Sequence, residues 1–312
     1  TLFRSAIYLI SGVGTVIGGF LAYYIFKGKI DELHAIAAMM VGTYTGGSVN
    51  LAAMKAAFSA SDTTSAAAVV ADNLLMALYF FVLIAIPTMQ FFLKKYKHPY
   101  IDEIEARTQK GDNENQAANF WKAKPVALLD IAEALAVSFA IVAVSTALAD
   151  FISSVIPTTN FALALLNGLI GNKYLIMTTL TMIVATAMPD FIGEIAGAQE
   201  IGTFLIHIFF TVIGVPASIY LIITEAPLLL VFCAIIVGMN MIFSLVFGKI
   251  FKFSIEEICV ASNANVGGPT TAAAYAIAKG WQSMVVPSLL VGTLGYVIGN
   301  YYGIFVGTFL GR

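Results

Sequence analysis

The stretch VGTYTGGSVN, Val41 to Asn50, interrupts a segment that is otherwise apolar enough to cross a membrane. It holds three glycines, two threonines, a serine and an asparagine. Non-helical backbone is tolerated at membrane depth only where protein or a water-filled cavity satisfies its N–H and C=O groups. The stretch therefore predicts a broken helix whose break lies in a partly hydrated, protein-lined place.

The composition of the 312-residue chain requires lipid as a solvent. Hydrophobic residues make up 59% of the chain and charged residues 11%, and the mean hydropathy is +0.89. One soluble core cannot bury that much apolar surface. Runs long enough to span a bilayer lie at 4–26, 31–58 (interrupted), 64–93, 128–152, 172–189, 200–223, 226–250, 254–280 (interrupted) and 283–311. None reads as a strand, so we expect an all-α polytopic protein integral to the cell membrane.

Several functional classes find no support in the chain. The formal net charge is −2 and no basic patch suggests a nucleic-acid partner. Cys233 and Cys259 lack metal-ligand or CxxC spacing and are interpreted as small packing residues. No HExxH, GxSxG or P-loop pattern occurs, so we expect neither an enzyme nor an ATP-driven pump, and no cofactor beyond a coupling ion.

One long polar segment, 94–125, divides the chain. Its Lys94–Lys124 stretch carries seven of the sixteen lysine and arginine residues, which places it in the cytoplasm by the positive-inside rule. We interpret it as a solvated linker. It separates residues 1–93 from residues 126–312.

These two parts resemble each other at an offset of 221 residues. Placing Gly46 and Gly47 on Gly267 and Gly268 aligns GTYTGGSVNLAAMKAAF with NANVGGPTTAAAYAIAK without a gap. Each part ends in a helix, a glycine-interrupted helix and a long helix. Residues 126–312 are then a second repeat, and 1–93 the C-terminal part of a first repeat. Completing that first repeat would need about 60 to 100 further N-terminal residues.

The helix count bears on how the repeats are related. Three spans between 126 and 225 make the repeats parallel, whereas inverted repeats need an even number there. The stretch 152–171, as a short or re-entrant span, would restore the inverted arrangement. We expect inverted repeats whose interrupted helices cross at mid-membrane.

Hydroxyl and amide side chains surround both predicted breaks. Such groups, with backbone carbonyls released by unwinding, are the hard oxygen ligands of small cations. Pro269 can open the second half-helix, whose free N–H groups suit an anionic group. The candidates are Thr43, Thr45, Gly46, Gly47, Ser48 and Asn50 at the first break, and Ser262, Asn263, Asn265, Gly267, Gly268, Thr270 and Thr271 at the second. The alternative is a kinked helix whose polar side chains only hold neighbouring helices together.

Asp72 is the acidic residue most deeply embedded in an apolar segment. An ionisable side chain inside the bilayer is by default a functional-site hypothesis. We expect it to bind a cation or exchange a proton, with Asn73 adding an amide and Thr45 and Asn265 completing a sodium site. The alternative is that Asp72 lies near the helix end and reaches interfacial water.

The last apolar run has glycines at every fourth position: Gly295, Gly299, Gly303, Gly307 and Gly311. Small residues along one stripe let another helix backbone approach closely. We predict a packing groove for the interrupted helix. Asn300, beside this stripe, is a weaker polar candidate.

The motifs GTYTGGSVN, ADNLLMALYF, SNANVGGPTTAAA and VVPSLLVGTLGYVIGNYYG closely resemble the YjcL-like family of uncharacterised bacterial membrane proteins, over essentially the whole chain. That family is similar, more distantly, to the crossing-helix superfamily of sodium/bile-acid symporters, sodium/proton antiporters and sodium/glutamate symporters. The resemblance implies a core domain with two crossing broken helices, a panel domain and elevator-type alternating access. Two departures stand out: the family's N-terminal helices are absent, and Thr293 replaces Asp72 in the second repeat.

The function predicted is a secondary active transporter, coupled to sodium or protons, for a small solute that is anionic or resembles an amino acid or peptide. The partners expected are bilayer lipid, that solute and, as an open question, a second copy of the chain. The competing classes are an uncoupled channel or exporter and a membrane-embedded receptor or scaffold.

Overall fold

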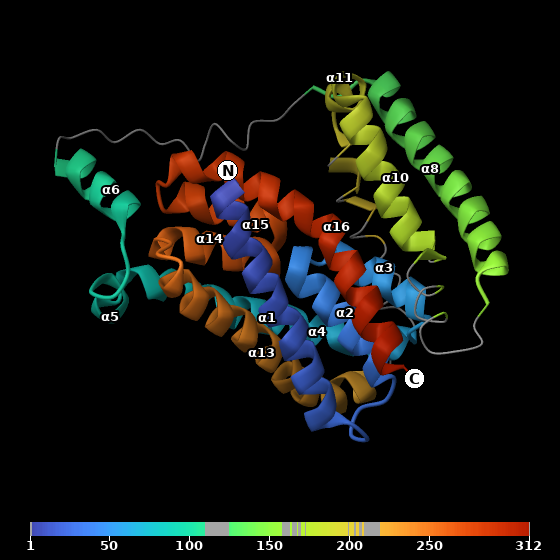
Figure 1. Ribbon diagram of the computed structural model, residues 1–312, viewed down its shortest axis with the longest axis horizontal. Coiled ribbons are helices and arrows are strands. Elements are labelled where there is room, and N and C mark those ends of the chain that lie inside the picture. Colours follow the sequence, from blue (N-terminus) through green and yellow to red (C-terminus); the bar gives the residue numbers. More distant parts are fainter. Residues whose placement is uncertain are drawn as a thin grey trace.

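The chain folds into helices that form one elongated body (Figure 1). The computed structural model describes residues 2–109, 125–157, 173–198 and 219–311, together with 163, 167, 170–171, 200–202, 204–205 and 208. Every named element among them is helical, which confirms the all-α prediction. Five helices are long and apolar enough to cross a membrane: Ser5–Phe26, Asp62–Thr88, Leu128–Val155, Ala226–Ile250 and Gln282–Leu310.

The first part of the chain contains one interrupted helix between two long ones. Its elements are α1 (Leu2–Phe26), α2 (Leu33–Gly46), α3 (Val49–Phe58), α4 (Asp62–Ala85), the 3-10 turn η1 (Ile86–Thr88), α5 (Gln90–Leu93) and α6 (Pro99–Gln109). The helix α4 starts with a Ser61 cap, whose side chain accepts from the Thr64 N–H.

In the second part, three named helices of the described residues precede another long helix, an interrupted helix and a final long helix. The elements of this part are α8 (Leu128–Val155), α10 (Lys173–Ala187), α11 (Pro189–Glu194), α13 (Ile219–Ile250), α14 (Ile255–Val266), α15 (Gly268–Ala278), η2 (Gln282–Met284) and α16 (Val285–Leu310). The predicted boundary between 223 and 226 is wrong, because α13 begins at Ile219 and continues through Pro227. Most of 200–218 and of 158–172 lies outside the described residues.

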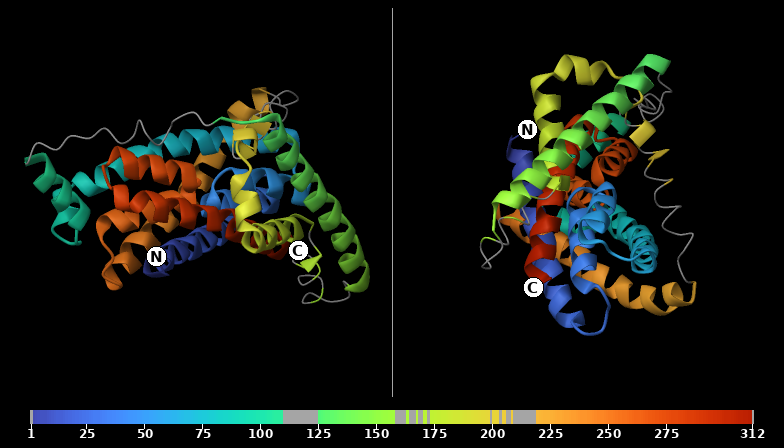
Figure 2. Two further views of the ribbon diagram at one scale, coloured as in Figure 1. Left: turned by 90° about the horizontal axis from the view of Figure 1, so that it is seen from above. Right: turned by 90° about the vertical axis from the view of Figure 1, so that its right-hand side faces the viewer.

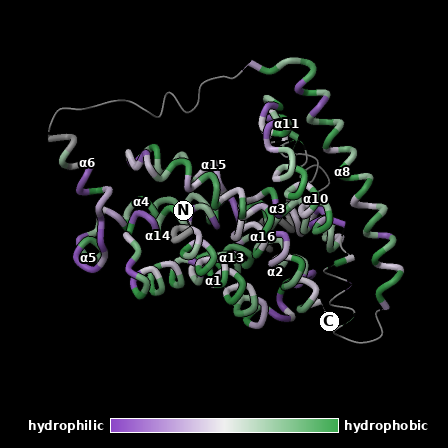
Figure 3. The backbone as a smooth tube through the Cα atoms, turned by 45° about the horizontal axis from the view of Figure 1, so that its top comes forward, coloured by the Kyte–Doolittle hydropathy of each residue, from purple (hydrophilic) through white to green (hydrophobic). Residues whose placement is uncertain are grey.

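The helices α1–α4 and α13–α16 form the centre of the molecule, and α8 and α10 lie at one end of it (Figures 1 and 2). In the centre α1 and α4 pack against α13, and α16 packs against α2 and α15. The helix α8 is apolar along most of its length (Figure 3) and buries only Ser145 and Ala149. Such an apolar, exposed helix is suited to a lipid environment.

The glycine stripe of α16 is the contact surface for α2 and α3, as predicted. A Cβ atom on Gly295 would lie 2.7 Å from Gly46 Cα, and one on Gly299 would lie 2.7 Å from the Gly42 carbonyl oxygen. The stripe continues with Gly303 against Ala38 and Met54. The helices meet backbone to backbone, which only glycine permits at this separation.

Part of the predicted linker is ordered and docked. The helix α6 begins where the backbone N–H groups of Tyr100 and Ile101 each donate to Glu256 Oε1 at 3.0 Å. The Ile255 N–H donates to the Lys97 carbonyl oxygen at 2.9 Å. The start of α14 is thereby tied to the segment that follows α5, which a solvated linker does not require. Residues 110–124 lie outside the described part.

Candidate functional site

The two helix interruptions touch each other. Gly47, which ends α2, has φ +94°, and Gly268, at the start of α15, has φ +83°. A Cβ atom on Gly47 would lie 3.1 Å from Gly268 Cα. Positive φ is costly for any residue with a side chain, so both conformation and contact require glycine. Pro269 stands in the first turn of α15, as predicted.

A polar side chain bridges each interruption. Asn50 Nδ2 donates to the Gly42 carbonyl oxygen at 3.0 Å, and also reaches the Gly295 carbonyl oxygen at 3.2 Å. Asn263 Nδ2 donates to the Thr271 carbonyl oxygen at 3.2 Å, while Thr271 Oγ1 bonds Asn263 Oδ1 at 3.1 Å. These predicted site residues therefore hold the two halves of each broken helix in register.

The helix α1 supplies partners for the backbone released by the first break. Thr15 Oγ1 donates to the Tyr44 carbonyl oxygen at 3.0 Å, and the Tyr8 hydroxyl donates to the Thr45 carbonyl oxygen. Asn265 Nδ2 of α14 donates in turn to the Tyr8 carbonyl oxygen at 3.0 Å. These two carbonyl oxygens at the break are thus satisfied by protein, as buried polar groups generally are.

Some buried polar atoms of α2, α4 and α14 have no hydrogen-bond partner among the described residues. They are Thr43 Oγ1, Tyr44 OH, Ser65 Oγ, Asp72 Oδ1 and Asn265 Oδ1. Leaving such an atom unpaired costs about 1–3 kcal/mol.

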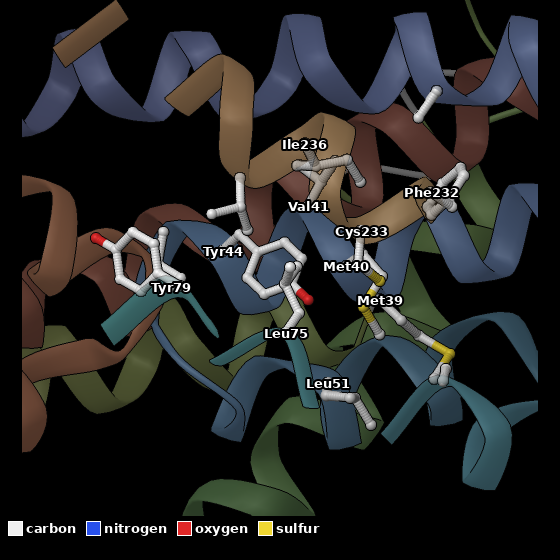
Figure 4. Packing of buried hydrophobic residues seen from close by; sticks show 14 of the residues in the cluster. Met39, Met40, Val41, Tyr44, Leu51, Leu75, Tyr79, Phe232, Cys233 and Ile236 are labelled. Atoms are coloured by element: carbon white, nitrogen blue, oxygen red, sulfur yellow. The ribbon is translucent and has the colours of Figure 1, made fainter. Parts of the chain in front are cut away.

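Asp72 points into the protein rather than toward lipid or bulk water, with only 3% of its surface exposed. The Tyr44 hydroxyl of α2 and the Cys233 thiol of α13 face it, although the Tyr44 geometry falls short of a hydrogen bond. Figure 4 shows Tyr44 together with Leu75 and Cys233 among the buried residues of the apolar cluster. Neither ion pair of the described chain involves Asp72. Among the described residues, its carboxyl group therefore has a phenol and a thiol as neighbours and no cationic side chain in an ion pair with it.

The three residues predicted to hold sodium have two different sets of neighbours. Thr45 and Asn265 both approach Gly12: a Cβ atom there would lie 3.7 Å from Thr45 Cγ2 and 3.3 Å from Asn265 Oδ1. Thr45 Oγ1 already donates to the Val41 carbonyl oxygen at 2.7 Å. The Asp72 side chain instead has the Tyr44 side chain of α2 as its neighbour. The structure gathers Thr45 with Asn265, and Asp72 with Tyr44.

The remaining candidates lie at the edges of this site. Asn73 is exposed on α4 and does not share the environment of Asp72. Ser48 is exposed and its side chain makes no cap bond to α3. Gly267 is the residue between α14 and α15, and Thr270 is half-buried in the first turn of α15. Asn300 Nδ2 donates to Thr178 Oγ1 of α10 at 2.7 Å, away from the breaks.

A buried hydrogen-bond network, most of which the sequence did not reveal, connects the two halves of the chain. The Tyr79 hydroxyl and Ser262 Oγ are 2.9 Å apart, and Ser262 Oγ donates to Asn240 Oδ1 at 2.8 Å. Asn240 Nδ2 donates to Thr15 Oγ1 at 2.9 Å and to the Ser11 carbonyl oxygen at 3.0 Å. The network reaches α2 through the bond from Thr15 to Tyr44. The signal for it in sequence was one amide, Asn240, within an otherwise apolar run.

We expect Asn240→Ala to destabilise the protein by about 1–3 kcal/mol, because it leaves several buried partners unpaired. The measurement is the melting temperature of the detergent-purified protein. Ile242→Ala is the matched control, since Ile242 is 53% exposed on the same helix and should have little effect. Equal melting temperatures for the two variants would contradict the network.

The fold and the site define an integral membrane protein with two interrupted helices in contact. The chain belongs to the DUF819 family, described as proteins of unknown function, whose model matches residues 5–312. It is 47% identical over 301 residues to the uncharacterized membrane protein YjcL of Bacillus subtilis (strain 168), covering 96% of this chain and 74% of that protein. The predicted resemblance to YjcL-like proteins is therefore confirmed, as is location in a membrane.

Proposed function

We propose that the protein is a secondary active transporter that couples the movement of sodium ions or protons to that of a small solute. The observation that carries the proposal is the contact between the interruptions at Gly47 and Gly268, beside buried oxygen atoms without partners. Interrupted helices that meet inside a membrane protein are characteristic of secondary-transporter sites. Their free backbone groups and half-helix ends provide ligands for ions and polar solutes.

We also propose that the chain contains two inverted repeats whose broken helices cross at mid-membrane. Support comes from positions 221 residues apart that play corresponding roles. Gly47 and Gly268 both have positive φ, and the polar bridges join 42 to 50 and 263 to 271. In this proposal α1–α4 and α13–α16 form the core domain, and α8 and α10 belong to the panel domain, by analogy with the crossing-helix transporters.

Ion coupling is assigned to Asp72, with sodium or a proton as the coupling ion. A buried carboxylate without a cationic partner gains most from either one. The oxygens of Thr45 and Asn265, near Gly12, are the second group that sodium would use, since sodium is a hard cation. The proposed solute is small and anionic, or resembles an amino acid or peptide. A negatively charged group is proposed because the N-termini of α3 and α15 suit one.

Transport follows if the ion and the solute bind the alternative conformations of the core with different affinities, because only differential affinity can shift the equilibrium. Movement of the core against the panel then exposes the site to each side of the membrane in turn. This is the elevator mechanism implied by the likeness to crossing-helix transporters.

The first test is the melting temperature of the purified protein in sodium chloride and in choline chloride, across pH. A ligand that binds only the native form stabilises it by mass action, so we expect a rise with sodium or a shift with pH. Uptake of labelled amino acids, short peptides and carboxylates into proteoliposomes should then require the corresponding gradient. Flux without a gradient would favour an uncoupled channel or exporter. If neither the melting temperature nor uptake responds to sodium or pH, a receptor or scaffold would be favoured.

A further inference from the structure

Two lysine-bearing segments from different halves of the chain meet at one end of the central helices. One segment follows α5, and the other contains the end of α13 and the turn to α14; Figure 1 shows both at the same end of the molecule. The Ile255 N–H donates to the Lys97 carbonyl oxygen at 2.9 Å, and the Tyr96 hydroxyl donates to the Leu245 carbonyl oxygen at 3.1 Å, across 149 residues of sequence. We call the lysines of these segments the lysine patch: Lys94, Lys95, Lys97, Lys249 and Lys252.

The lysine patch is exposed, whereas the carboxylates beside it have partners of their own. All five lysines are exposed, and neither ion pair of the described residues includes one of them. Glu256 is buried and accepts two backbone N–H groups of α6, and Glu257 accepts the N–H of its own helix cap. Asp102 pairs with His98, and Glu103 lines a cavity with the turn 280–283. Among the described residues of this end, the lysines are thus the charged groups that remain for a partner outside the protein.

The lysine patch lies where two candidate membrane spans end, at Thr88 and at Ile250. Exposed aromatic rings accompany it: Phe91 is 58% exposed and Phe251 51% exposed. The Lys95 Nζ atom lies 4.0 Å from the centroid of the Phe91 ring. Lysines and aromatic rings at the end of a span suit the membrane–water interface, because the ring meets acyl chains while the ammonium group stays in the headgroup layer.

We propose that the lysine patch binds the anionic headgroups of phospholipids. Clusters of about four to eight basic residues next to a membrane helix are the pattern that recognises anionic lipid. The lysine ammonium groups donate charge-assisted hydrogen bonds to the phosphate oxygens, and Phe91 and Phe251 contact the acyl chains. A bound lipid therefore stabilises the contact between the two halves of the chain at this end. The inference goes beyond the proposed function and does not depend on it.

The test is native mass spectrometry of the purified protein from micelles that contain equal amounts of phosphatidylglycerol and phosphatidylcholine. The unmodified protein should retain phosphatidylglycerol in preference. The four-lysine variant Lys94→Gln/Lys95→Gln/Lys249→Gln/Lys252→Gln should lower the ratio of the two bound lipids by about tenfold or more, because each lysine near an anionic surface is worth roughly a fivefold change in affinity. Lys97 is kept, since its carbonyl oxygen joins the two segments.

Two matched variants separate a lipid site from a general effect of charge or of misfolding. Arginine at the same four positions keeps the charge, so the lipid preference should persist. Lys27→Gln/Lys29→Gln removes two exposed lysines after α1, at the end where Phe26 contacts the Phe232 ring at 6.0 Å. That end is remote from the lysine patch, because Gly248 lies against Ile7 near the start of α1, so this variant should also keep the preference. The melting temperature in phosphatidylcholine alone should be equal for all variants.

Three results would overturn the inference. The first is a four-lysine variant that retains the preference for phosphatidylglycerol. The second is an equal loss of preference in Lys27→Gln/Lys29→Gln, which would make the effect one of overall charge. The third is displacement of phosphatidylglycerol by inorganic phosphate at the same concentration, which would make the patch a site for free phosphate instead of lipid. None of these results bears on ion-coupled transport, so the proposed function is tested separately.

Discussion

We expect Gly46→Ala to prevent stable assembly of the central helices. The added methyl group would lie 2.1 Å from the Gly295 carbonyl oxygen and 2.2 Å from its carbon. These are backbone atoms, which cannot rotate away as a flexible side chain can. Overpacking costs about 1–3 kcal/mol and occasionally more, and a backbone clash belongs at the upper end. The measurements are the yield of monodisperse protein in detergent and its melting temperature.

Gly238→Ala provides the matched control for this substitution. Gly238 lies within α13, and apart from its chain neighbours and the backbone of its own helix no described atom is within 4 Å of a Cβ built there. Replacing a helical glycine by alanine stabilises a helix by about 0.5–1 kcal/mol, so this variant should equal or exceed the parent protein. A Gly46→Ala variant that folds as well as Gly238→Ala would show that α2 and α16 are not in backbone contact.

The second large effect is expected from Asp72→Asn, which should abolish the response to the coupling ion. An amide carries no charge and takes up no proton, so neither sodium nor pH should change the stability of the variant through this site. In the unmodified protein, an ion at 100 times its dissociation constant adds about 2.7 kcal/mol. Melting temperatures over a sodium series and a pH series compare the two. Gradient-driven uptake should be lost together with the shift.

Asp62→Asn separates this effect from a general loss of charge. Asp62 lies at the exposed start of α4 and pairs with Lys55 at 2.7 Å. Exposed ion pairs contribute about 0–1 kcal/mol, so the ion response should survive. A sodium or pH response that persists in Asp72→Asn and not in Asp62→Asn would move the coupling site away from Asp72.

The helical fold could be predicted because its signals are local. Apolar runs of membrane length, the glycine pairs at 46–47 and 267–268, and the four-residue glycine period each describe one stretch of chain. The period also identified the partner of α16, since a stripe of small residues calls for a closely packed helix. The boundary before α13 was missed because Pro227 is accommodated inside a membrane helix, where neighbouring groups replace the lost hydrogen bond.

The details of the site could not be predicted because they depend on side-chain direction. Asp72 and Asn73 are adjacent in sequence, yet one is buried and the other exposed. Asn50 and Asn263 bind backbone across the breaks, a role that composition alone does not distinguish from ligand binding. Tyr44 and Asn240 stand in apolar surroundings, and only the packing of α1, α4 and α13 around them reveals their contacts. The docking of α6 on Glu256 joins segments more than 150 residues apart.

The lengths of the half-helices have an electrical consequence. With 14 and 10 residues, α2 and α3 are about 21 and 15 Å long at 1.5 Å per residue. In the proposed crossing arrangement, the break then falls near the middle of a hydrocarbon layer about 30 Å thick. An ion that reaches the proposed site has crossed roughly half of the membrane voltage, or about 1 kcal/mol per charge at 100 mV. Its affinity from either side of the membrane then depends on the voltage as well as on concentration.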